Sequence, residues 1–446
     1  MKKCDILLKN GTLLTPELEI KEGISVAISG GRIAEVREEK VLDGQYDAKE
    51  TIDASGKLIM PGLVDSHVHA CQYMLRGKLA DEYPMVWTRI LVPFESTLNE
   101  QDSYLSGQLT YLQQIKSGIT TCNESGGNHM HMVVKAAEES GIRANIARST
   151  MDQGAFIPDS WRETAEEAIE RTEELYKNCN NLGNGRIKIW FAMRQVMSCS
   201  PKLLRMIGEK ASEYNTGIHA HLCEHRDEVS YCLQNYRKRP VEVLYDYGIL
   251  GKNFLGAHNV VLTDADIELL AKCDAKLCHC PRANLGNHGV PRTPTILHAG
   301  LSIGIGSDGA SGCNMDFFEE LRILRFALQA VLGLPIFDPT IIPIKALLKM
   351  LIKGGARAAL MEKEIGEISA GMRADVILLD IEQPHIMPNS NLINVLVEGV
   401  RASDVTDSII DGRLIMRNRE VLTMDEKKII ADGKQRMKEI FARAGI

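Results

Sequence analysis

Residues 58–69 form the stretch LIMPGLVDSHVH, an apolar run that ends in two histidines separated by one residue. The run is long enough for a buried strand, and alternation along a strand places His67 and His69 on the same face. A strand that stays apolar until its carboxyl end is typical of a parallel β/α barrel, because the active site of such a barrel opens at the carboxyl ends of its strands. We therefore expect this segment to be the first barrel strand.

Seven further strand-like segments follow the first. They cover 118–124, 143–151, 186–194, 216–224, 254–260, 275–284 and 301–309. Amphipathic helical patterns separate them, for example at 161–176 and 264–272. Eight strands alternating with helices predict an α/β fold, a (β/α)₈ TIM barrel. A doubly wound sheet is the rival architecture, but it favours a glycine-rich phosphate turn after its first strand, and this sequence has none there.

Both ends of the chain are rich in short alternating segments and hairpin turns, such as the one at 408–416 around Asp411-Gly412. We expect 1–60 and 370–446 to pair into one small β-sandwich domain beside a metal-dependent barrel of 61–369. Residues 425–444 have the pattern of a closing amphipathic helix.

The composition is that of an ordinary globular protein, with 44% hydrophobic and 25% charged residues. The net charge of -7 argues against nucleic acid as the main partner, because phosphate binding needs a basic face. The sequence shows no secretory signal pattern and no apolar run near the ~20 residues of a membrane span, so we expect a cytoplasmic protein without a membrane partner. The eleven cysteines are expected to be reduced, and packing explains Cys278 and Cys280 more simply than metal ligation does.

Polar residues end three more of the predicted strands. The fifth ends in His221 and Glu224, the sixth in His258 and the eighth in Asp308. An isolated histidine is usually a satisfied polar residue, but the carboxyl ends of barrel strands meet at one mouth, so these side chains should converge with the two histidines of the first strand. Imidazole nitrogen and carboxylate oxygen are ligands suited to Zn²⁺ or Fe²⁺. The sequence therefore predicts a metal site at that mouth.

Four motifs together resemble one superfamily. PGLVDSHVH at 61–69 is similar to the first-strand signature of the amidohydrolases, and HAHLCE at 219–224 to their fifth-strand deaminase motif. GAH at 256–258 and GSD at 306–308 resemble the sixth and eighth strands. The resemblance covers nearly the whole chain. It is greatest to the branch of nucleobase deaminases and chlorohydrolases, which includes guanine deaminases, methylthioadenosine and adenosylhomocysteine deaminases and triazine hydrolases.

The resemblance implies a role for each of these residues. The ligands of one divalent metal, Zn²⁺ in the first place and Fe²⁺ otherwise, would be His67, His69, His221 and Asp308. Glu224 would carry a proton to the substrate ring, His258 would orient or stabilise the attacking hydroxide, and Asp308 would also accept a proton from water. The alternative for Glu224 is an acid that merely begins a helix. The implied reaction is hydrolytic deamination of an amino-substituted N-heterocycle with release of ammonia.

The predicted fourth strand argues for a single metal. A two-metal site needs a bridging acid or a carbamylated lysine at the end of this strand. Lys188 lies near its other end, and Arg194, which ends it, stays protonated and cannot bridge metals. This also argues against hydantoinase-like chemistry, which resembles the two-metal branch.

Four residues are candidates for substrate binding. Gln72 and Arg194 resemble positions at which guanine deaminases contact the base, and the fixed donors of Arg194 suit a ring that carries a carbonyl group. The alternative for Arg194 is a structural ion pair with Glu124. Trp87 and Glu95 match positions in adenosine-type deaminases, where the glutamate meets the ribose, and the alternative for both is fold maintenance. We therefore expect guanine, 8-oxoguanine or a pterin-like ring in preference to adenine.

Other functions remain open at the level of sequence. Residues 279–284, 286–289 and 311–314 depart from the patterns of known family members, which leaves the choice among a pterin, an oxidised purine and a triazine open. A methylthioadenosine or adenosylhomocysteine deaminase and a triazine amino- or chlorohydrolase are the alternative functions. A scaffold protein that has lost its metal is disfavoured, because all four expected ligands are present. The expected partners are a small heterocyclic substrate and a second copy of the chain in a homodimer.

Overall fold

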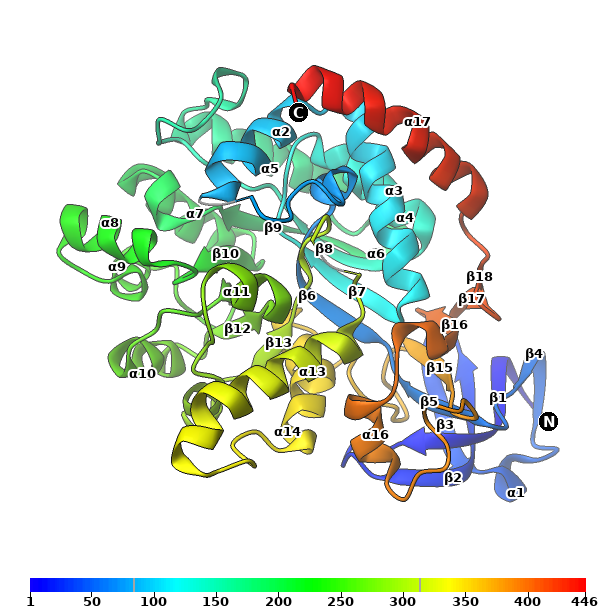
Figure 1. The fold of residues 1–446 in the computed structure, drawn as a ribbon. Coiled ribbons are helices and arrows are strands. Elements are labelled where there is room, and N and C mark those ends of the chain that lie inside the picture. The colour runs from blue at the N-terminus through cyan, green and yellow to red at the C-terminus, as the bar shows by residue number, and fades with distance from the viewer. Residues whose placement is uncertain (83–84, 313) are drawn as a thin grey trace.

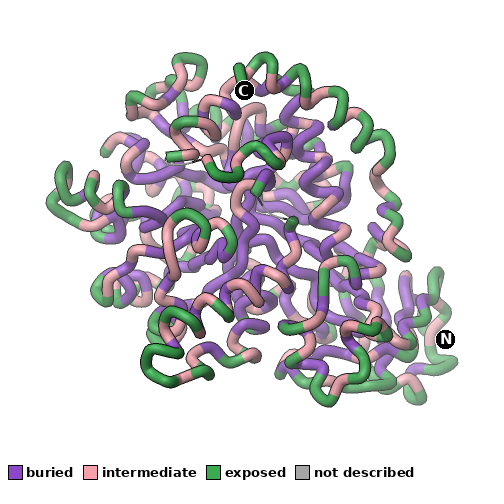
Figure 2. Tube along the Cα trace, viewed as in Figure 1, coloured by how far each residue is buried: buried purple, intermediate pink, exposed green. Residues whose placement is uncertain are grey.

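A computed structural model describes residues 1–82, 85–312 and 314–446. One nine-stranded parallel sheet forms its centre, with helices around it, and a second sheet lies beside it (Figure 1). The strands of the first sheet are β6 (Leu63–His69), β7 (Ile119–Glu124), β8 (Arg143–Ala147), β9 (Ile187–Met193), β10 (Ile218–Leu222), β11 (Phe254–His258), β12 (Lys276–His279), β13 (Ile303–Ile305) and β14 (Asp308–Gly309). In the burial view these central strands are almost entirely buried, while the exposed residues lie at the periphery (Figure 2).

The parallel sheet curls until its two ends meet in one segment of chain. The hydrogen-bonded order runs from β13 to β14, and only Gly306 and Ser307 separate these two strands in sequence. Asp308 of β14 pairs with Val68 of β6. Ser307 donates hydrogen bonds from its backbone N–H and its hydroxyl to Asp65 of β6, at 3.0 and 2.6 Å. The carboxyl ends of all these strands therefore lie around one mouth.

The helices begin where the sequence supplies capping residues. Asn99, Thr164 and Thr263 each close a capping box at the start of α3, α5 and α10. The helices are α1 (Glu39–Leu42), α2 (Val92–Thr97), α3 (Glu100–Lys116), α4 (Met130–Ser140), α5 (Ala165–Cys179), α6 (Leu182–Gly185), α7 (Pro201–Glu213), α8 (Arg226–Tyr236), α9 (Pro240–Asp246), α10 (Asp264–Lys272), α11 (Pro281–Asn287), α12 (Thr293–His298), α13 (Phe317–Leu328), α14 (Ile344–Lys349), α15 (Gly355–Ala358), α16 (Leu392–Glu398) and α17 (Glu426–Ala444).

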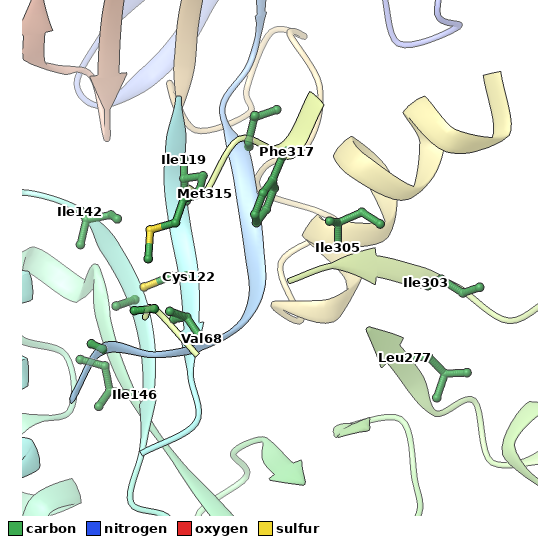
Figure 3. Close-up of a cluster of buried hydrophobic side chains, with 14 of the residues drawn as sticks. Val68, Ile119, Cys122, Ile142, Ile146, Leu277, Ile303, Ile305, Met315 and Phe317 are labelled. Atoms are coloured by element: carbon green, nitrogen blue, oxygen red, sulfur yellow. The ribbon is translucent and has the colours of Figure 1, made fainter. Parts of the chain in front are cut away.

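Alternation along β6 separates core from site. Val68 packs in the hydrophobic cluster of Figure 3 with Ile119 and Cys122 of the neighbouring β7. Because successive side chains in a strand point to opposite faces, His67 and His69 lie on the face away from this cluster. The apolar stretch thus fixes the strand in the core and aims both imidazoles at the inside of the curled sheet.

Several predicted strands differ from the observed ones. The strand expected at 143–151 ends at Ala147, and the one expected at 301–309 is divided into β13 and β14. The expected strand at 58–69 is divided at Gly62, where a Cβ atom would lie 2.1 Å from Oγ1 of Thr120, so only glycine fits against β7. Its first part, β5 (Lys57–Pro61), joins the second sheet. The expected strand at 275–284 ends at His279, and α11 begins at Pro281, a residue that favours the first turn of a helix.

The second sheet is built from both ends of the chain, as expected. Its order is β18-β17-β16-β15-β5-β1-β2-β3, and β4 pairs with β1. The strands are β1 (Lys2–Leu14), β2 (Ile20–Ser29), β3 (Arg32–Glu38), β4 (Tyr46–Asp53), β5, β15 (Val376–Asp380), β16 (Val405–Ile410), β17 (Arg413–Arg417) and β18 (Glu420–Val421). Hydrogen bonds connect all nine strands, and a hydrophobic core separate from that of the parallel sheet includes Val26, Ile28, Val376 and Leu378.

Buried ion pairs join the parts of the molecule. Arg143, the first residue of β8, donates to both carboxylate oxygens of Asp375, at 2.8 and 3.0 Å, and to Asp411 at 3.1 Å. The expected C-terminal helix is α17, and its Arg436 donates to the fully buried Asp102 of α3 at 2.6 Å. The ten described cysteines are free, and Cys278 and Cys280 are buried. Within the described residues, every helix is too short or too polar to cross a membrane.

Candidate metal centre and active site

Three imidazoles converge at the mouth of the curled sheet. His67 and His69 come from the carboxyl end of β6, and His221 comes from β10. All three are buried, and their ring centroids lie 4.7 to 5.1 Å apart. The fold therefore brings His69 and His221 together, although 152 positions separate them in the sequence.

The protonation of His69 and His221 follows from their outer contacts. Nδ1 of His221 lies 2.7 Å from the carbonyl oxygen of Arg194, and Nδ1 of His69 lies 3.4 Å from that of Gly126, so Nδ1 is the protonated nitrogen in each ring. Burial lowers the pKa of His221 to about 3, which keeps that ring neutral. The two Nε2 atoms are 3.0 Å apart, so two lone pairs face each other. A cation between them would relieve that repulsion.

His67 and Asp308 complete the group. Nε2 of His67 lies 3.4 Å from Oδ1 of Asp308, and Nε2 of His69 lies 3.8 Å from the same oxygen. The His67 Nε2 atom is buried and has no hydrogen-bond partner among the described residues, while its Nδ1 lies 2.8 Å from Nε2 of His219. An orphaned nitrogen beside a carboxylate, together with the facing lone pairs, fits a bound divalent metal.

His258 lies close enough to the group to be considered as a ligand. The candidate ligand atoms of His67, His221, His258 and Asp308 all lie within 4.8 Å of one another. However, Nδ1 of His258 faces the side-chain amide of Asn284 at 3.0 Å, and the oxygen of that amide already accepts a hydrogen bond from the Cys280 backbone N–H.

This contact assigns the tautomer of His258. The amide of Asn284 must present its NH₂ group, so Nδ1 of His258 accepts and Nε2 carries the proton. The Glu224 carboxylate, whose Oε1 lies 3.9 Å from Nε2, favours a proton on that nitrogen as well. His258 is thus a hydrogen-bond donor toward the site, whereas His67, His69 and His221 present acceptors.

Glu224 is a buried carboxylate that faces the same site. Its Oε2 accepts a hydrogen bond from Nε2 of Gln195 at 2.6 Å, and its Oε1 lies 3.1 Å from Nε2 of His288 and 3.9 Å from Nε2 of His258. Burial alone would raise the pKa of Glu224, but the two histidines outweigh it and hold this pKa well below its ordinary value. The residue that caps α8 is His225, so the contacts of Glu224 are those of the site.

A cavity of about 540 Å³ opens beside these groups. Its lining includes Asp308, Glu224 and His288, together with two of the predicted substrate residues, Gln72 and Trp87. The indole ring of Trp87 packs edge-on against Phe156, with 4.8 Å between ring centroids. Asp308, one of the candidate ligands, and Glu224 thus border a space that a small molecule can occupy.

The other two predicted substrate residues pair with each other. The terminal nitrogens of Arg194 lie 3.1 and 3.2 Å from the carboxylate oxygens of Glu95, and Gln72 donates to the same carboxylate at 2.6 Å. Neither Arg194 nor Glu95 is among the described residues that line the cavity. The alternative pairing of Arg194 with Glu124 is not formed, because Glu124 accepts hydrogen bonds from two backbone N–H groups instead.

Four residues around the site escaped the sequence analysis as functional candidates. They are Gln195, His219, Asn284 and His288. His219 stands in the quoted HAHLCE motif, and Asn284 and His288 stand in two of the segments that depart from the family pattern. Their contacts join separate strand ends, so no local spacing could have assigned their partners.

A curled parallel sheet whose strand ends bring together three imidazoles and a carboxylate is typical of metal-dependent hydrolases. The chain belongs to the amidohydrolase family, whose model matches residues 58–415. This confirms the expected superfamily and a hydrolase acting on carbon–nitrogen bonds.

Relatives with similar sequences cover almost the whole chain. A 5-methylthioadenosine/S-adenosylhomocysteine deaminase of Acetivibrio thermocellus is 35% identical over 98% of this chain and 99% of its own length. A 5'-deoxyadenosine deaminase of Methanosarcina acetivorans is 31% identical over 99% of both chains.

Solved structures have the same fold. An adenosine deaminase of Xanthomonas campestris with bound zinc has a TM-score of 0.91 and 25% identity over 99% of both chains. The guanine deaminase of E. coli has a TM-score of 0.81 and 22% identity over 94% of this chain and 100% of its own, a likeness of fold alone.

Proposed function

We propose that this chain is a zinc-dependent deaminase that hydrolyses an amino-substituted N-heterocycle and releases ammonia. The observation that carries the proposal is the convergence of unprotonated imidazole nitrogens and Asp308 next to the buried carboxylate of Glu224. The curled sheet, whose two ends lie in one segment of chain, supports a (β/α)₈ barrel with this site at its mouth.

The residues that would hold one Zn²⁺ are His67, His69, His221 and Asp308. When bound, the metal supplies the Lewis acidity that makes a water molecule nucleophilic near neutral pH. His258 is better suited to a different task, because its Nε2–H points at the site and can donate to an oxygen that gains negative charge.

The protons in the reaction balance within the site. Asp308 accepts one proton from the attacking water and returns it to the leaving amine, which departs as ammonia. Glu224 delivers a proton to the ring nitrogen beside the reacting carbon, and the second proton of the water replaces it. Gln195 holds the Glu224 carboxylate in place by its 2.6 Å hydrogen bond. Because its pKa is lowered, the Glu224 carboxylate is unprotonated at rest, and the proton that it delivers must first reach it from a neighbouring donor.

The best-supported substrate is an aminopurine nucleoside of the methylthioadenosine type. Relatives with 31% to 35% identity over nearly the whole chain carry names of adenine-nucleoside deaminases. The cavity volume equals about 18 water volumes at ~30 Å³ each, so a bare purine of roughly ten non-hydrogen atoms fills only part of it. The argument for a carbonyl-bearing ring loses force, because Glu95 occupies the terminal nitrogens of Arg194.

A second candidate is an oxo-substituted ring such as guanine, 8-oxoguanine or a pterin. Gln72 donates its amide N–H to Glu95, and its Oε1 is buried without a hydrogen-bond partner among the described residues. An acceptor in that position suits a ring with a lactam N–H. This observation keeps the second candidate in the test.

The test is ammonia release from a panel with metal analysis of the same protein. The panel contains 5'-methylthioadenosine, 5'-deoxyadenosine, guanine, 8-oxoguanine, pterin and the triazine ammeline. We expect about one zinc per chain and the highest kcat/KM on 5'-methylthioadenosine. Guanine or pterin as the best substrate would favour the second candidate. A protein that holds less than about 0.2 equivalents of metal, takes up no added zinc and turns over no substrate would contradict the proposed enzymatic function. Such a result would favour a scaffold protein. Light scattering tests the expected homodimer.

A further inference from the structure

The segment after β12 touches both of the groups to which we assign proton chemistry. Asn284 of α11 donates to Nδ1 of His258, and His288, which follows the last residue of α11, lies 3.1 Å from Glu224. One short stretch of chain, from Asn284 to His288, therefore contacts both His258 and Glu224.

The two oxygens of Glu224 have partners of different chemistry. Oε2 accepts from the amide of Gln195, which cannot release its proton near neutral pH. Oε1 faces Nε2 of His288, whose imidazole can release a proton near neutral pH. The His288 side chain is 19% exposed and that of Glu224 is 12% exposed, and both line the cavity. His288 thus contacts Glu224 at the wall of the cavity that both side chains line.

We propose that His288 is the proton partner of Glu224: it positions the carboxylate and shares with it the proton that reaches the substrate ring. The inference rests on the proposed function, because it needs Glu224 as the proton carrier. In the resting pair the proton lies on Nε2 of His288. It crosses the 3.1 Å contact to Oε1 of Glu224 and passes to the ring nitrogen, and a proton of the attacking water restores the pair.

The surroundings of His288 contain several charged groups. Those that line the same cavity or whose rings lie near it are Glu224, His225, Asp227, His258, Arg282 and Asp308. Burial lowers the pKa of His288, but the hydrogen bond to Glu224 outweighs burial, with Asp308 adding in the same direction, and the pKa is raised. Arg282 of the lining is itself paired with Glu319 at 2.9 Å.

This environment predicts the direction of the pH dependence. Because the pKa of His288 is raised above its ordinary 6.5, the pair loses its shared proton only as the pH rises through that raised value. Turnover that needs the shared proton should therefore fall on the alkaline side of the profile. A residue that only packs against Glu224 would leave this limb unchanged when it is replaced.

The experiment compares His288→Gln, His288→Ala and a matched control in the zinc-loaded protein, with the best substrate of the panel. Glutamine keeps an N–H donor for Glu224 but cannot titrate. We expect zinc content to stay near one per chain, kcat to fall about 10- to 100-fold with little change in KM, and the alkaline limb to disappear. Added imidazole should restore part of the turnover of His288→Ala. The control is His131→Gln, a surface histidine that pairs with Glu100 at 3.0 Å and should leave the profile unchanged.

A second measurement does not depend on activity. Histidine-selective NMR should show the His288 ring titrating above 6.5 in the wild type and at a lower pH in Glu224→Gln, because that change removes the negative charge. An unchanged kcat and pH profile in His288→Gln would overturn the proposed role of His288 but not the proposed function. The same holds if the His288 ring titrates at the same pH in the wild type and in Glu224→Gln. A wild type with zinc that deaminates none of the panel would instead contradict the proposed function, and the NMR titration would still decide the pairing.

Discussion

At the scale of single residues, the position of the proton on each imidazole determines which ring nitrogen is free to bind a metal ion. His69 and His221 keep Nδ1 protonated by backbone carbonyls and so turn bare Nε2 atoms inward. His258 has the opposite tautomer, because Asn284 donates to its Nδ1. Proximity alone would make His258 a ligand, but the hydrogen-bond pattern makes it a donor.

Replacing the two histidines separately tests this assignment. We expect His69→Ala to bind less than about 0.2 equivalents of zinc, because one of four ligands is lost. His258→Ala should keep zinc near one equivalent and lose turnover by about 100-fold, because only a hydrogen-bond donor is removed. Metal analysis after gel filtration and single-substrate kinetics make the comparison. Zinc lost in His258→Ala but kept in His69→Ala would reverse the assignment.

The carboxylate of Glu224 gives a second prediction at this scale. Glu224→Gln keeps the size of the side chain and the contact with Gln195, but it cannot carry a proton. Turnover should fall by at least about 100-fold while zinc stays bound, since proton carriers typically contribute that much or more. Retained turnover in a zinc-loaded Glu224→Gln protein would leave Glu224 with a structural role only.

The ion pair between Arg194 and Glu95 gives a third prediction. Both side chains are buried, so Arg194→Met leaves a buried carboxylate without its partner and should destabilise the protein by about 3–5 kcal/mol. The double change Arg194→Met with Glu95→Leu should cost less than the sum of the single changes. Thermal or urea unfolding of the four proteins measures this coupling. Additive losses would show that the pair is not coupled, and Arg194 would again be available as a substrate contact.

Many residues of this site could be predicted from the sequence, but the contacts between them could not. His67, His69, His221 and Asp308 could be predicted because each stands at the end of an apolar strand pattern, and parallel strands bring such ends together. The pairing of Arg194 with Glu95 could not, because Glu95 lies on α2, a helix outside the strand pattern, and contacts Arg194 only through the fold. The assigned roles remain predictions until the variants are measured.

At the scale of elements, periodicity predicted where strands and helices lie better than where they end. The expected helix at 264–272 has the bounds of α10, because Thr263 supplies a clear cap. The strand expected at 275–284 was too long, since its apolar run continues into α11 beyond Pro281. Apolar runs do not distinguish a buried strand from a buried helical turn, so the end of β12 could not be read from hydrophobicity.

The closing helix α17 gives a prediction at this scale. Asp102 at the start of α3 is fully buried and accepts hydrogen bonds from Arg436 and Arg443 of α17, besides closing the capping box of α3. Asp102→Ala removes a cap and leaves two arginines without their acceptor, so we expect a loss of roughly 2–4 kcal/mol. The control Glu439→Ala removes an exposed partner of Arg436 and should cost less than about 1 kcal/mol. Equal shifts in unfolding temperature for the two variants would show that Asp102 does not hold α17 in place.

At the scale of the whole molecule, the two sheets depend on each other through a few buried charges. β5 and β6 are consecutive strands that lie in different sheets, so the chain passes between the sheets at Gly62. Arg143 at the start of β8 reaches Asp375 and Asp411 in the part of the chain that forms the second sheet. The strand β6, which carries His67 and His69, therefore begins next to the second sheet and ends at the candidate site.

This junction predicts how the protein responds to acid. Burial would raise the pKa of Asp411, but Arg143 and Arg373 outweigh burial and lower it below 3.8. A group with a lowered pKa in the folded state stabilises the fold above its unfolded pKa, and that contribution is lost as the pH falls through the folded value. Stability should thus decrease as the pH falls from about 5 towards the lowered folded pKa of Asp411, and Arg143→Met should lower stability at pH 7 while making this dependence on pH shallower. Urea midpoints at several pH values measure both effects. If Arg143→Met and the wild type lose stability in parallel on acidification, the charges at the junction do not set the acid limit, and other carboxylates must.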